Sequence, residues 1–579
     1  MNTERYAELH TPAQVKEKIE QTISRLASQP VTLGQVWITI KDPEQLRQDA
    51  EVVGSKLAQG VNLPLAGLTV AVKDNIDVAG LPTTCAAPWS SHVPEENATC
   101  VQRLIDAGAI IVGKTNMDQF ATGLVGTRSP YGVVRCVHDT NLISGGSSSG
   151  SGVATAYGEV DIALGTDTAG SGRVPAAFNR IYGIKPTVGM IPVTGVTPAC
   201  PSFDTVSVFC RDIILGYKVL SIISGEDGRD SRARVLPEDM KMSVQSKPVV
   251  LAPLKENIDG MDERWESLFF KEMERFESEG VTVQRVDVTV LLEAAKLLYG
   301  GSLVAERYAS IGQLFADKFD ENAGEDPSVR SIVMNAKTLT ADLYVKDTQK
   351  LLDARMISKK IFDNADALVL PTTTRHPTID QVQADPINVN SDLGRFTNFV
   401  NLLDLSALAV PSKIDPDLGI TLIAPAFHDY ALASVADRLG LVDASNMPVP
   451  DYGVELFVVG EHMRGLSLNH QLQDLGARFE REAFTSDDYR LVDLPTTPAK
   501  PTIVRGAEGK GGKIAGEIWR LSPVALAEFL NSLPHPMSLG PVDLEDGRII
   551  IGFGVDSAVY KAKDITSYSS WRAYLAENK

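Results

Sequence analysis

Short, mostly apolar segments that alternate with helix-like segments constrain the fold of this chain more than any other feature. The apolar segments lack the alternation of polar and apolar residues that marks a half-buried strand, so they predict strands covered on both faces. Strands and helices in alternation favour an α/β fold with a mixed, mostly parallel central sheet covered by helices. The predicted strands are GLTVAVKD (67–74), AIIVGK (109–114), DIALGTD (161–167), PVVLAPL (248–254) and ALVLPTT (367–373).

Helices are predicted before and between the first of these strands. The pairs Thr11-Pro12 and Asp42-Pro43 each combine a good N-cap residue with a proline suited to the first helical turn. A further helix is expected around 98–107, where apolar residues recur at helical spacing directly before a predicted strand.

The pattern changes near 441–452, where prolines and polar residues predict a linker. Beyond it, VELFVVG and RIIIGFG (548–554) are typical of strands in a smaller α+β domain, and 505–513 is expected to form a loop. The full length of 579 residues is too great for one ordinary domain. We therefore expect two domains, residues 1–445 and 446–579.

The composition excludes several classes of function. A net charge of −19 repels nucleic-acid backbones and anionic membranes, so neither is an expected partner. No apolar run reaches the roughly 18 residues of a transmembrane helix, and the N-terminal sequence lacks a signal-peptide pattern. The 5 cysteines are widely spaced without a CxxC pair, which favours reduced thiols and a cytoplasmic location. The sequence contains neither an HExxH motif nor a Cys/His cluster, so no metal or organic cofactor is expected.

The most unusual segment is SGGSSSGSG (144–152), which is rich in glycine and serine. Such runs often form flexible linkers, but this one is short and lies between predicted secondary-structure elements. It lacks the Lys-Ser/Thr pair of a phosphate-binding P-loop. Two catalytic interpretations remain, a nucleophile elbow and a serine nucleophile that is activated by a lysine.

The elbow interpretation depends on GSSSG, which matches the GxSxG pattern with Ser148 at its centre. An elbow serine follows a strand directly, whereas the preceding segment VHDTNLISGG is a poor strand. The elbow also needs a histidine as its base, and one of the 8 in the chain would have to serve. The lysine interpretation points to Lys73 at the end of an apolar strand, where burial lowers the pKa of an amine. A solvated surface position is the alternative for Lys73.

Three segments resemble the amidase signature family. GGSSSGSG followed by GTDTAGSGRVPA (165–176) is similar to its core motif, and AVKDN and GKTNMDQFATG are similar to its flanking motifs. The resemblance implies the amidase signature fold for the N-terminal domain and a Ser–cisSer–Lys triad. Ser171 would be the nucleophile, Ser147 the bridging serine on a cis peptide bond, and Lys73 the base, and these residues have the family's spacing.

The same resemblance implies an oxyanion hole made by the backbone N–H groups of Thr168, Ala169, Gly170 and Ser171. Ala169 stands where many family members have glycine. Because the donors are backbone groups, the chemistry is expected to persist with alanine there. Asp167 is expected to fix the loop and not to act in catalysis.

Two further segments narrow the expected substrate. LLYGGSLVAERYA (297–309) resembles the substrate-binding segment of allophanate hydrolases, which implies that Tyr299 and Arg307 contact the substrate. A guanidinium pairs well with a carboxylate, and a solvated position on a helix surface is the alternative for Arg307. Gly123 is a further candidate for the same pocket, with an ordinary turn glycine as the alternative, and a core position is the alternative for Tyr299. The chain from 453 to 579 resembles the C-terminal domain of that family, with His470 first and then His535 as candidate acid–base residues.

The resemblance therefore implies hydrolysis of allophanate through an acyl-enzyme, with release of ammonia and of a product that decarboxylates to CO2. It also implies a homodimer and a urea carboxylase that acts in the same pathway. Two alternatives stay open. One is another amidase, such as a glutamine-hydrolysing amidotransferase subunit. The other is a non-enzymatic scaffold for pathway enzymes. The presence of intact Lys73, Ser147 and Ser171 argues against a scaffold.

Overall fold

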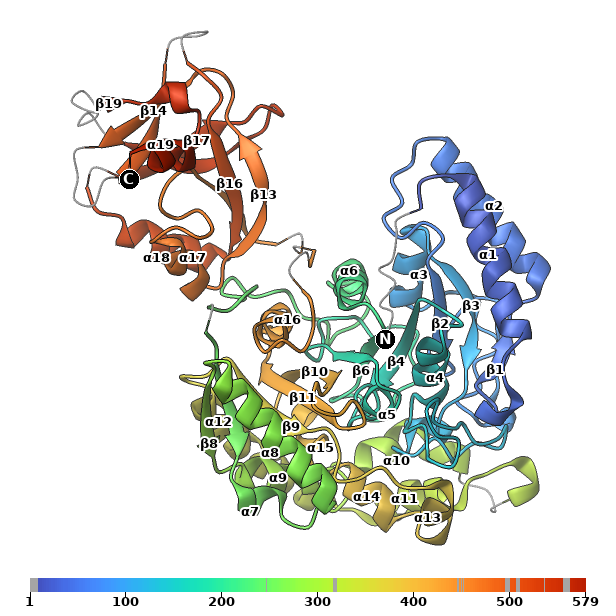
Figure 1. Cartoon of the computed structure of the whole chain (residues 1–579). Coiled ribbons are helices and arrows are strands. Elements are labelled where there is room, and N and C mark those ends of the chain that lie inside the picture. Colours follow the sequence, from blue (N-terminus) through green and yellow to red (C-terminus); the bar gives the residue numbers. More distant parts are fainter. Residues whose placement is uncertain are drawn as a thin grey trace. The chain divides into compact units, whose positions relative to one another are not determined.

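The chain divides into two compact units in the computed structural model (Figure 1). Unit 1 comprises Met1–Val235 and Val249–Met447, and unit 2 comprises Leu236–Pro248 and Pro448–Lys579. The predicted boundary, between 445 and 446, lies outside the residues that the structure describes. Those residues are 9–245, 247–315, 320–444, 447–448, 450, 452–494, 500–506, 511–535, 537–555 and 563–578.

An 11-stranded mixed sheet with the order β1-β3-β2-β4-β6-β5-β10-β11-β9-β7-β8 forms the centre of unit 1. The predicted strands are all present in it, and the sequence analysis missed the others. The bounds are β1 (Trp37–Ile40), β2 (Thr69–Lys73), β3 (Ile110–Thr115), β4 (Ile162–Asp167), β5 (Tyr182–Lys185), β6 (Thr205–Cys210), β7 (Val249–Pro253), β8 (Thr282–Val286), β9 (Ala367–Pro371), β10 (Leu405–Pro411) and β11 (Gly419–Pro425).

The sheet is mixed, as expected, but parallel pairing does not dominate it. β3, β2 and β4 pair in parallel, as do β9, β7 and β8. Between these groups, β4, β6, β5, β10, β11 and β9 pair antiparallel in turn, and β1 pairs antiparallel with β3. The reason is partly local, because a short connection such as 412–418 between β10 and β11 turns the chain straight back, whereas a parallel pair needs a long crossover.

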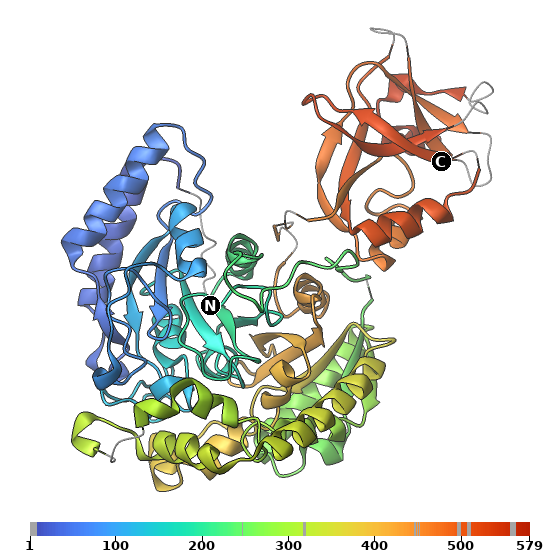
Figure 2. The same cartoon turned by 180° about the vertical axis from the view of Figure 1, so that it is seen from behind.

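Helices cover this sheet, and the three predicted near the N-terminus are present. Thr11 caps the first of them in a capping box with Gln14, and Asp42 caps the second. Figures 1 and 2 show these two helices side by side at the β1 end of the sheet. The bounds are α1 (Pro12–Ala27), α2 (Pro43–Ala58), α3 (Thr99–Asp106), α4 (Ser149–Tyr157), α5 (Val174–Phe178), α6 (Ile213–Ile223), α7 (Lys255–Ile258), α8 (Glu263–Ser278), α9 (Thr289–Lys296), α10 (Ala305–Ile311), α11 (Pro327–Asn335), α12 (Ala341–Ile361), α13 (Ile379–Ala384), α14 (Asn388–Leu393), α15 (Asn398–Leu402) and α16 (Asp429–Arg438).

Unit 2 is the expected α+β domain. It contains a 5-stranded sheet in the order β13-β16-β12-β18-β17 and a 3-stranded sheet in the order β15-β14-β19. Its elements are β12 (Val454–Val458), α17 (Asn469–Asp474), β13 (Arg478–Phe484), β14 (Tyr489–Leu494), β15 (Lys500–Arg505), β16 (Ala515–Leu521), α18 (Pro523–Ser532), β17 (Met537–Asp543), β18 (Ile549–Val555), β19 (Lys563–Asp564) and α19 (Trp571–Glu577).

A short segment between α6 and β7, Leu236–Pro248, also belongs to unit 2. The backbone N–H of Met242 donates to the carbonyl of Gly476, and that of Val524 donates to the carbonyl of Glu238. The sequence analysis did not predict that a segment between two elements of unit 1 belongs to unit 2. Within the described residues, no helix has the length and apolar character needed to cross a membrane.

Neighbouring phenylalanines on α8 provide a test of where the core lies. The side chain of Phe269 is fully buried, whereas that of Phe270 is only partly buried. We expect Phe269→Ala to lower the free energy of unfolding of unit 1 by about 3–5 kcal/mol, because it leaves a cavity in a packed core. Phe270→Ala is the matched control and should cost about 1 kcal/mol. Urea denaturation of the full chain measures both, and equal losses would show that α8 does not pack as described.

Candidate active site

Three side chains predicted to form a triad lie in one hydrogen-bonded chain. The Nζ atom of Lys73 is 2.7 Å from the Oγ atom of Ser147, and Ser147 Oγ is 2.9 Å from the Oγ atom of Ser171. The peptide bond between Gly146 and Ser147 is cis. All three side chains are nearly or fully inaccessible to solvent. A proton can therefore move between Ser171 and Lys73 along two short hydrogen bonds.

Parallel strands bring the lysine to this position. Lys73 ends β2, and the neighbouring parallel strand β4 ends in Thr166 and Asp167, so these side chains meet at one edge of the sheet. Lys73 Nζ also contacts Thr166 Oγ1 at 2.8 Å. The sequence analysis did not single out Thr166, although its place within the GTD segment at a strand end is a usable signal.

The Gly/Ser segment packs tightly and is not a linker. Its serines are buried, and Ser149 begins α4. A Cβ atom added to Gly146 would lie 2.0 Å from Asp118 Oδ2, so only glycine fits there. Ser148, the centre of the alternative elbow motif, is fully buried, and its Oγ atom donates to the carbonyl of Thr166. It is therefore not placed as the exposed nucleophile of an elbow. Small residues here allow the backbone to pack closely against the Asp118 side chain and the backbone of Asn116.

Burial sets the protonation of Lys73. Removal of the amine from water lowers its pKa from 10.5 to about 7, and the charges of Asp118, Asp167 and Asp204 offset only part of this effect. At neutral pH a large fraction of the amine is uncharged and carries a free lone pair. Lys73 therefore has the property that a general base needs.

The loop that follows β4 is fixed by a buried ion pair. Arg173 binds Asp167 through two hydrogen bonds of 3.0 and 2.9 Å, and both side chains are fully buried. Burial raises the pKa of Asp167, but the Arg173 guanidinium outweighs it, so the pKa lies below its ordinary value. Asp167 also accepts the backbone N–H groups of Gly170 and Gly172. Asp167 thus holds the loop around Ser171, as its position in the sequence suggested.

The bonds that Asp167 accepts reduce the number of backbone amides that can face a substrate oxygen. The N–H of Gly170, one of the predicted oxyanion donors, is already bound to Asp167 Oδ1 at 3.0 Å. The N–H groups of Thr168, Ala169 and Ser171 donate to no acceptor within the described part of the chain. A buried N–H group without an acceptor is rare, so these three are the better candidates for an oxyanion site.

Tyr299 and Arg307 lie together, as the sequence analysis expected of a shared pocket. Arg307 is fully buried, which excludes the alternative of a solvated helix surface. Its Nη2 atom donates to the hydroxyl of Tyr299 at 2.8 Å, and its Nη1 atom donates to Thr122 Oγ1 at 2.7 Å. The carbonyls of Phe120 and Ala121 accept further, longer bonds from the same guanidinium.

The loop that holds Arg307 also contacts the triad. The backbone N–H of Asp118 donates to the carbonyl of Ser147 at 3.1 Å. The buried Asp118 carboxylate accepts the N–H groups of Val125, Gly126 and Arg128, which fixes the loop. Gly123 lies in this loop, buried against the Asp118 side chain. The sequence analysis missed Asp118, whose place in GKTNMDQFATG was the available signal.

The two candidate histidines lie in unit 2 and are both exposed. His470 is on α17, where its Nδ1 atom is 2.9 Å from the carbonyl of Ser467. A third histidine, His462, is buried in the same unit. Its ring stacks on Phe553 with centroids 5.1 Å apart, and its Nε2 atom lies 2.9 Å from Gln471 Oε1. The sequence alone did not distinguish these environments.

Comparisons with known proteins agree with this geometry. The Amidase family model matches residues 18–433, and the model of the Allophanate hydrolase C-terminal domain matches residues 454–576. The solved structure of Kluyveromyces lactis allophanate hydrolase is similar over 98% of this chain and 97% of that chain, with a TM-score of 0.86 and 35% identity.

Curated relatives add two kinds of similarity. The urea amidolyase of Saccharomyces cerevisiae is 38% identical over 98% of this chain, but this chain spans only 33% of that protein. A Glutamyl-tRNA(Gln) amidotransferase subunit of Sulfurisphaera tokodaii is 31% identical over 73% of this chain and 94% of its own length. The chain belongs to the amidase family, and an allophanate hydrolase C-terminal domain follows its amidase domain.

Proposed function

We propose that this chain hydrolyses the terminal amide of allophanate and releases ammonia. The observation that carries the proposal is the hydrogen-bonded series Lys73–Ser147–Ser171 in the same unit as the buried pair Tyr299–Arg307. The first supplies an activated nucleophile, and the second supplies a cation for an anionic substrate. The similarity to the Kluyveromyces lactis allophanate hydrolase over nearly the whole of both chains supports this choice of substrate.

The first step forms an acyl-enzyme. Ser171 Oγ attacks the amide carbonyl while its proton passes to Ser147 Oγ, and the Ser147 proton passes to the uncharged Lys73 amine. Negative charge then develops on the carbonyl oxygen. The N–H groups of Thr168, Ala169 and Ser171 stabilise this oxyanion, and one such donor contributes about 2.7–4 kcal/mol to the lowering of the barrier.

The leaving group needs a proton because an amide anion is a poor leaving group. The Lys73 ammonium donates to Ser147, and Ser147 donates to the departing nitrogen, so that ammonia leaves. Water then attacks the acyl-enzyme, its proton follows the same route to Lys73, and Ser171 is regenerated. The second product carries two carboxylates and decarboxylates to CO2 and ammonia.

Arg307 is proposed to hold the substrate carboxylate. Its Nη atoms are occupied by protein acceptors, but its buried Nε–H has no acceptor among the described residues. A buried donor of this kind is costly unless a ligand pairs with it. Tyr299 and Gly123 complete the candidate substrate residues, and the guanidinium lies over the Tyr299 ring at 5.4 Å.

Further proposals follow from the family resemblance alone. His470 and His535 are candidates for acid–base work on the second product in unit 2. A urea carboxylase is the proposed partner in the pathway, since the similar yeast protein is a urea amidolyase. A homodimer and a cytoplasmic location belong to the same set of proposals.

Substitution of the nucleophile tests the proposed reaction. The purified chain should release ammonia from allophanate and much less from glutamine, and Ser171→Ala should lower kcat by at least about a thousandfold. Ser148→Ala is the matched control and should stay within about tenfold, since that hydroxyl bonds only the backbone carbonyl and N–H of Thr166. Ammonia from glutamine but not from allophanate would overturn the substrate assignment. Equal losses in the two variants would overturn the choice of nucleophile.

The rate should depend on pH through Lys73. The base works only when uncharged, and its pKa is lowered to about 7, so kcat/KM should rise with pH below about 7 and level off above it. The slope below the pKa should approach about tenfold per pH unit. Steady-state rates between about pH 5 and 10 measure this profile. A rise that continues to pH 10 would show that the base keeps the ordinary pKa of a lysine.

A change of cation tests the role of Arg307. Arg307→Lys keeps the charge but loses the planar fork, and kcat/KM for allophanate should fall by about a hundredfold. The control is a neutral substrate analogue in which an amide replaces the carboxylate, because its hydrolysis should fall much less. Equal losses for both substrates would assign Arg307 a structural role. Thermal unfolding of the variant confirms that it remains folded.

A further inference from the structure

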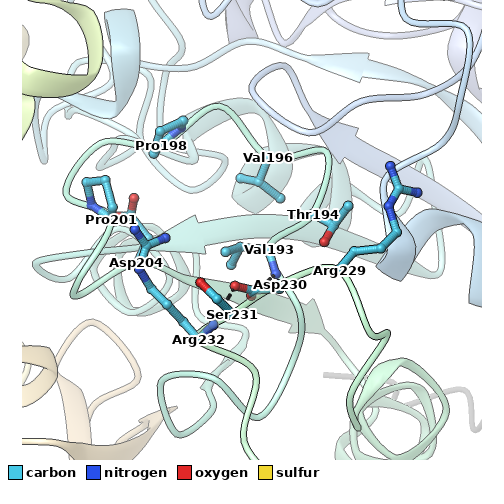
Figure 3. A pocket seen from close by; sticks show the side chains of 10 residues that line it. All are labelled: Val193, Thr194, Val196, Pro198, Pro201, Asp204, Arg229, Asp230, Ser231 and Arg232. Carbon is cyan, nitrogen blue, oxygen red and sulfur yellow. Dashed lines mark hydrogen bonds between the residues drawn. The ribbon is translucent and has the colours of Figure 1, made fainter.

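Two neighbouring pockets open on unit 1 beside the loop that leads into β6. Both are lined by Arg232 and by residues of this loop, Pro198 and Asp204 in the first pocket and Ser202 in the second. Figure 3 shows the first pocket, of about 320 Å³, with Asp204 and Arg232 on one side and Arg229 on the other. Its charges are mixed, because Asp204 and Asp230 also line it and Arg229 pairs with Glu96 at 3.0 Å.

The second pocket differs in its charge. It has a volume of about 450 Å³, which is within the range of small-ligand sites. Its lining contains the guanidinium groups of Arg232, Arg234 and Arg355 against the single carboxylate of Asp404. A local excess of positive charge is unexpected in a chain with a net charge of −19. Such a concentration of like charges is unfavourable unless an anion offsets it.

Two of the guanidinium groups are held in place by the protein. Arg234 donates to Asp404 Oδ1 at 2.7 Å and to the carbonyl of Val188 at 3.2 Å, and it lies over the Phe427 ring at 4.4 Å. Arg355 is fixed through its Nε atom, which donates to the carbonyl of Leu402 at 2.7 Å. Both groups are therefore oriented before any ligand arrives, which reduces the entropy lost on binding.

The remaining donors of the pocket have no protein acceptor. The guanidinium of Arg232 makes no hydrogen bond or ion pair with the described residues, and the terminal nitrogens of Arg355 make none either. Burial lowers the pKa of Arg355, and the charge of Arg234 lowers it further, while Asp404 offsets only part of this. The cations of this pocket are thus incompletely neutralised by the protein itself.

We propose that this pocket, lined by Arg232, Arg234 and Arg355, binds a small dianion. Three guanidinium groups and one carboxylate leave two positive charges, which match two negative charges on a ligand. Guanidinium groups bind carboxylate and phosphate oxygens in paired hydrogen bonds. Ser202 lines the same pocket and supplies a neutral polar group, whereas the Asn401 amide in its wall is bound to Asp167, Phe203 and Arg173. Neither Ser171 nor Arg307 lines this pocket, and this proposal does not depend on the proposed reaction.

The pocket shares one residue with the supports of the catalytic loop. Asn401 donates to the carbonyl of Asp167 at 2.8 Å and accepts a bond from Arg173, the partner of Asp167. Its neighbour Thr397 donates to the carbonyl of Ala169 at 2.6 Å. The pocket therefore borders residues that hold the catalytic loop.

Calorimetric titration of the full-length Ser171→Ala chain tests the proposal. The probes are malonate, a small dicarboxylate, and inorganic phosphate, each at constant ionic strength. We expect saturable binding of one of them with one equivalent per chain, and Arg232→Gln and Arg355→Gln should each weaken it by about tenfold. The tighter probe distinguishes an organic dicarboxylate from an inorganic anion as the ligand.

Two control variants decide where the anion binds. Arg229 lies near Arg232 in the connection between α6 and β7, but it does not line this pocket. Arg229→Gln should therefore change the affinity by less than about twofold. Arg307→Lys alters the proposed substrate cation and should also leave the affinity unchanged. Three outcomes would overturn the proposal. The first is binding that is lost only in Arg307→Lys, and the second is an equal loss in Arg229→Gln and Arg232→Gln. The third is the absence of saturable binding at millimolar concentration. Thermal unfolding shows whether each variant is folded.

Discussion

The burial of a single amine governs the architecture of this active site. Lys73 has no exposed surface, and its Nζ atom contacts only the hydroxyls of Ser147 and Thr166 among the hydrogen-bond partners in the described residues. A charged ammonium in this position would lose its hydration without gaining a direct carboxylate partner, so its pKa falls to about 7. The same burial creates the base, and the hydrogen bond to Ser147 connects it to the nucleophile.

The surrounding carboxylates make this arrangement possible because they are occupied elsewhere. Asp167 binds Arg173, Asp118 accepts backbone N–H groups of its own loop, and Asp204 accepts those of Ala199 and Cys200. None of them forms an ion pair with Lys73 in the described structure. Each also fixes one loop next to the triad. The groups that shape the site are therefore the same groups that would raise the pKa of the lysine if they moved toward it.

Much of this site could be predicted from the sequence because its parts lie in short, contiguous segments. Lys73 ends an apolar strand, and Ser147 and Ser171 lie in short glycine-rich segments whose sequence and spacing match the family motif. Capping residues also predicted α1 and α2 correctly, since a cap depends on neighbours within one turn. Roles for Arg307 and Tyr299 in substrate binding were expected from resemblance, whereas the bond between them and the complete burial of Arg307 became visible only in the structure.

The features that sequence analysis missed depend on distant parts of the chain. Strand direction in the middle of the sheet is set by which strands become neighbours, and β5 and β10 are far apart in the sequence. The assignment of Leu236–Pro248 to unit 2 likewise depends on contacts made with residues much later in the chain. The motif predicted a free N–H at Gly170, but the bond of this group to Asp167 depends on the three-dimensional geometry of the loop.

The most direct test of this account is the titration of Lys73 itself. NMR of the chain with 13C-labelled lysine, with Lys73→Met to assign the signal, follows the carbon next to Nζ as the pH is raised. The account predicts a midpoint near pH 7, because burial lowers the pKa to about 7. A midpoint near the ordinary value of 10.5 would contradict it, since the amine would then be charged at neutral pH and unable to accept a proton from Ser147.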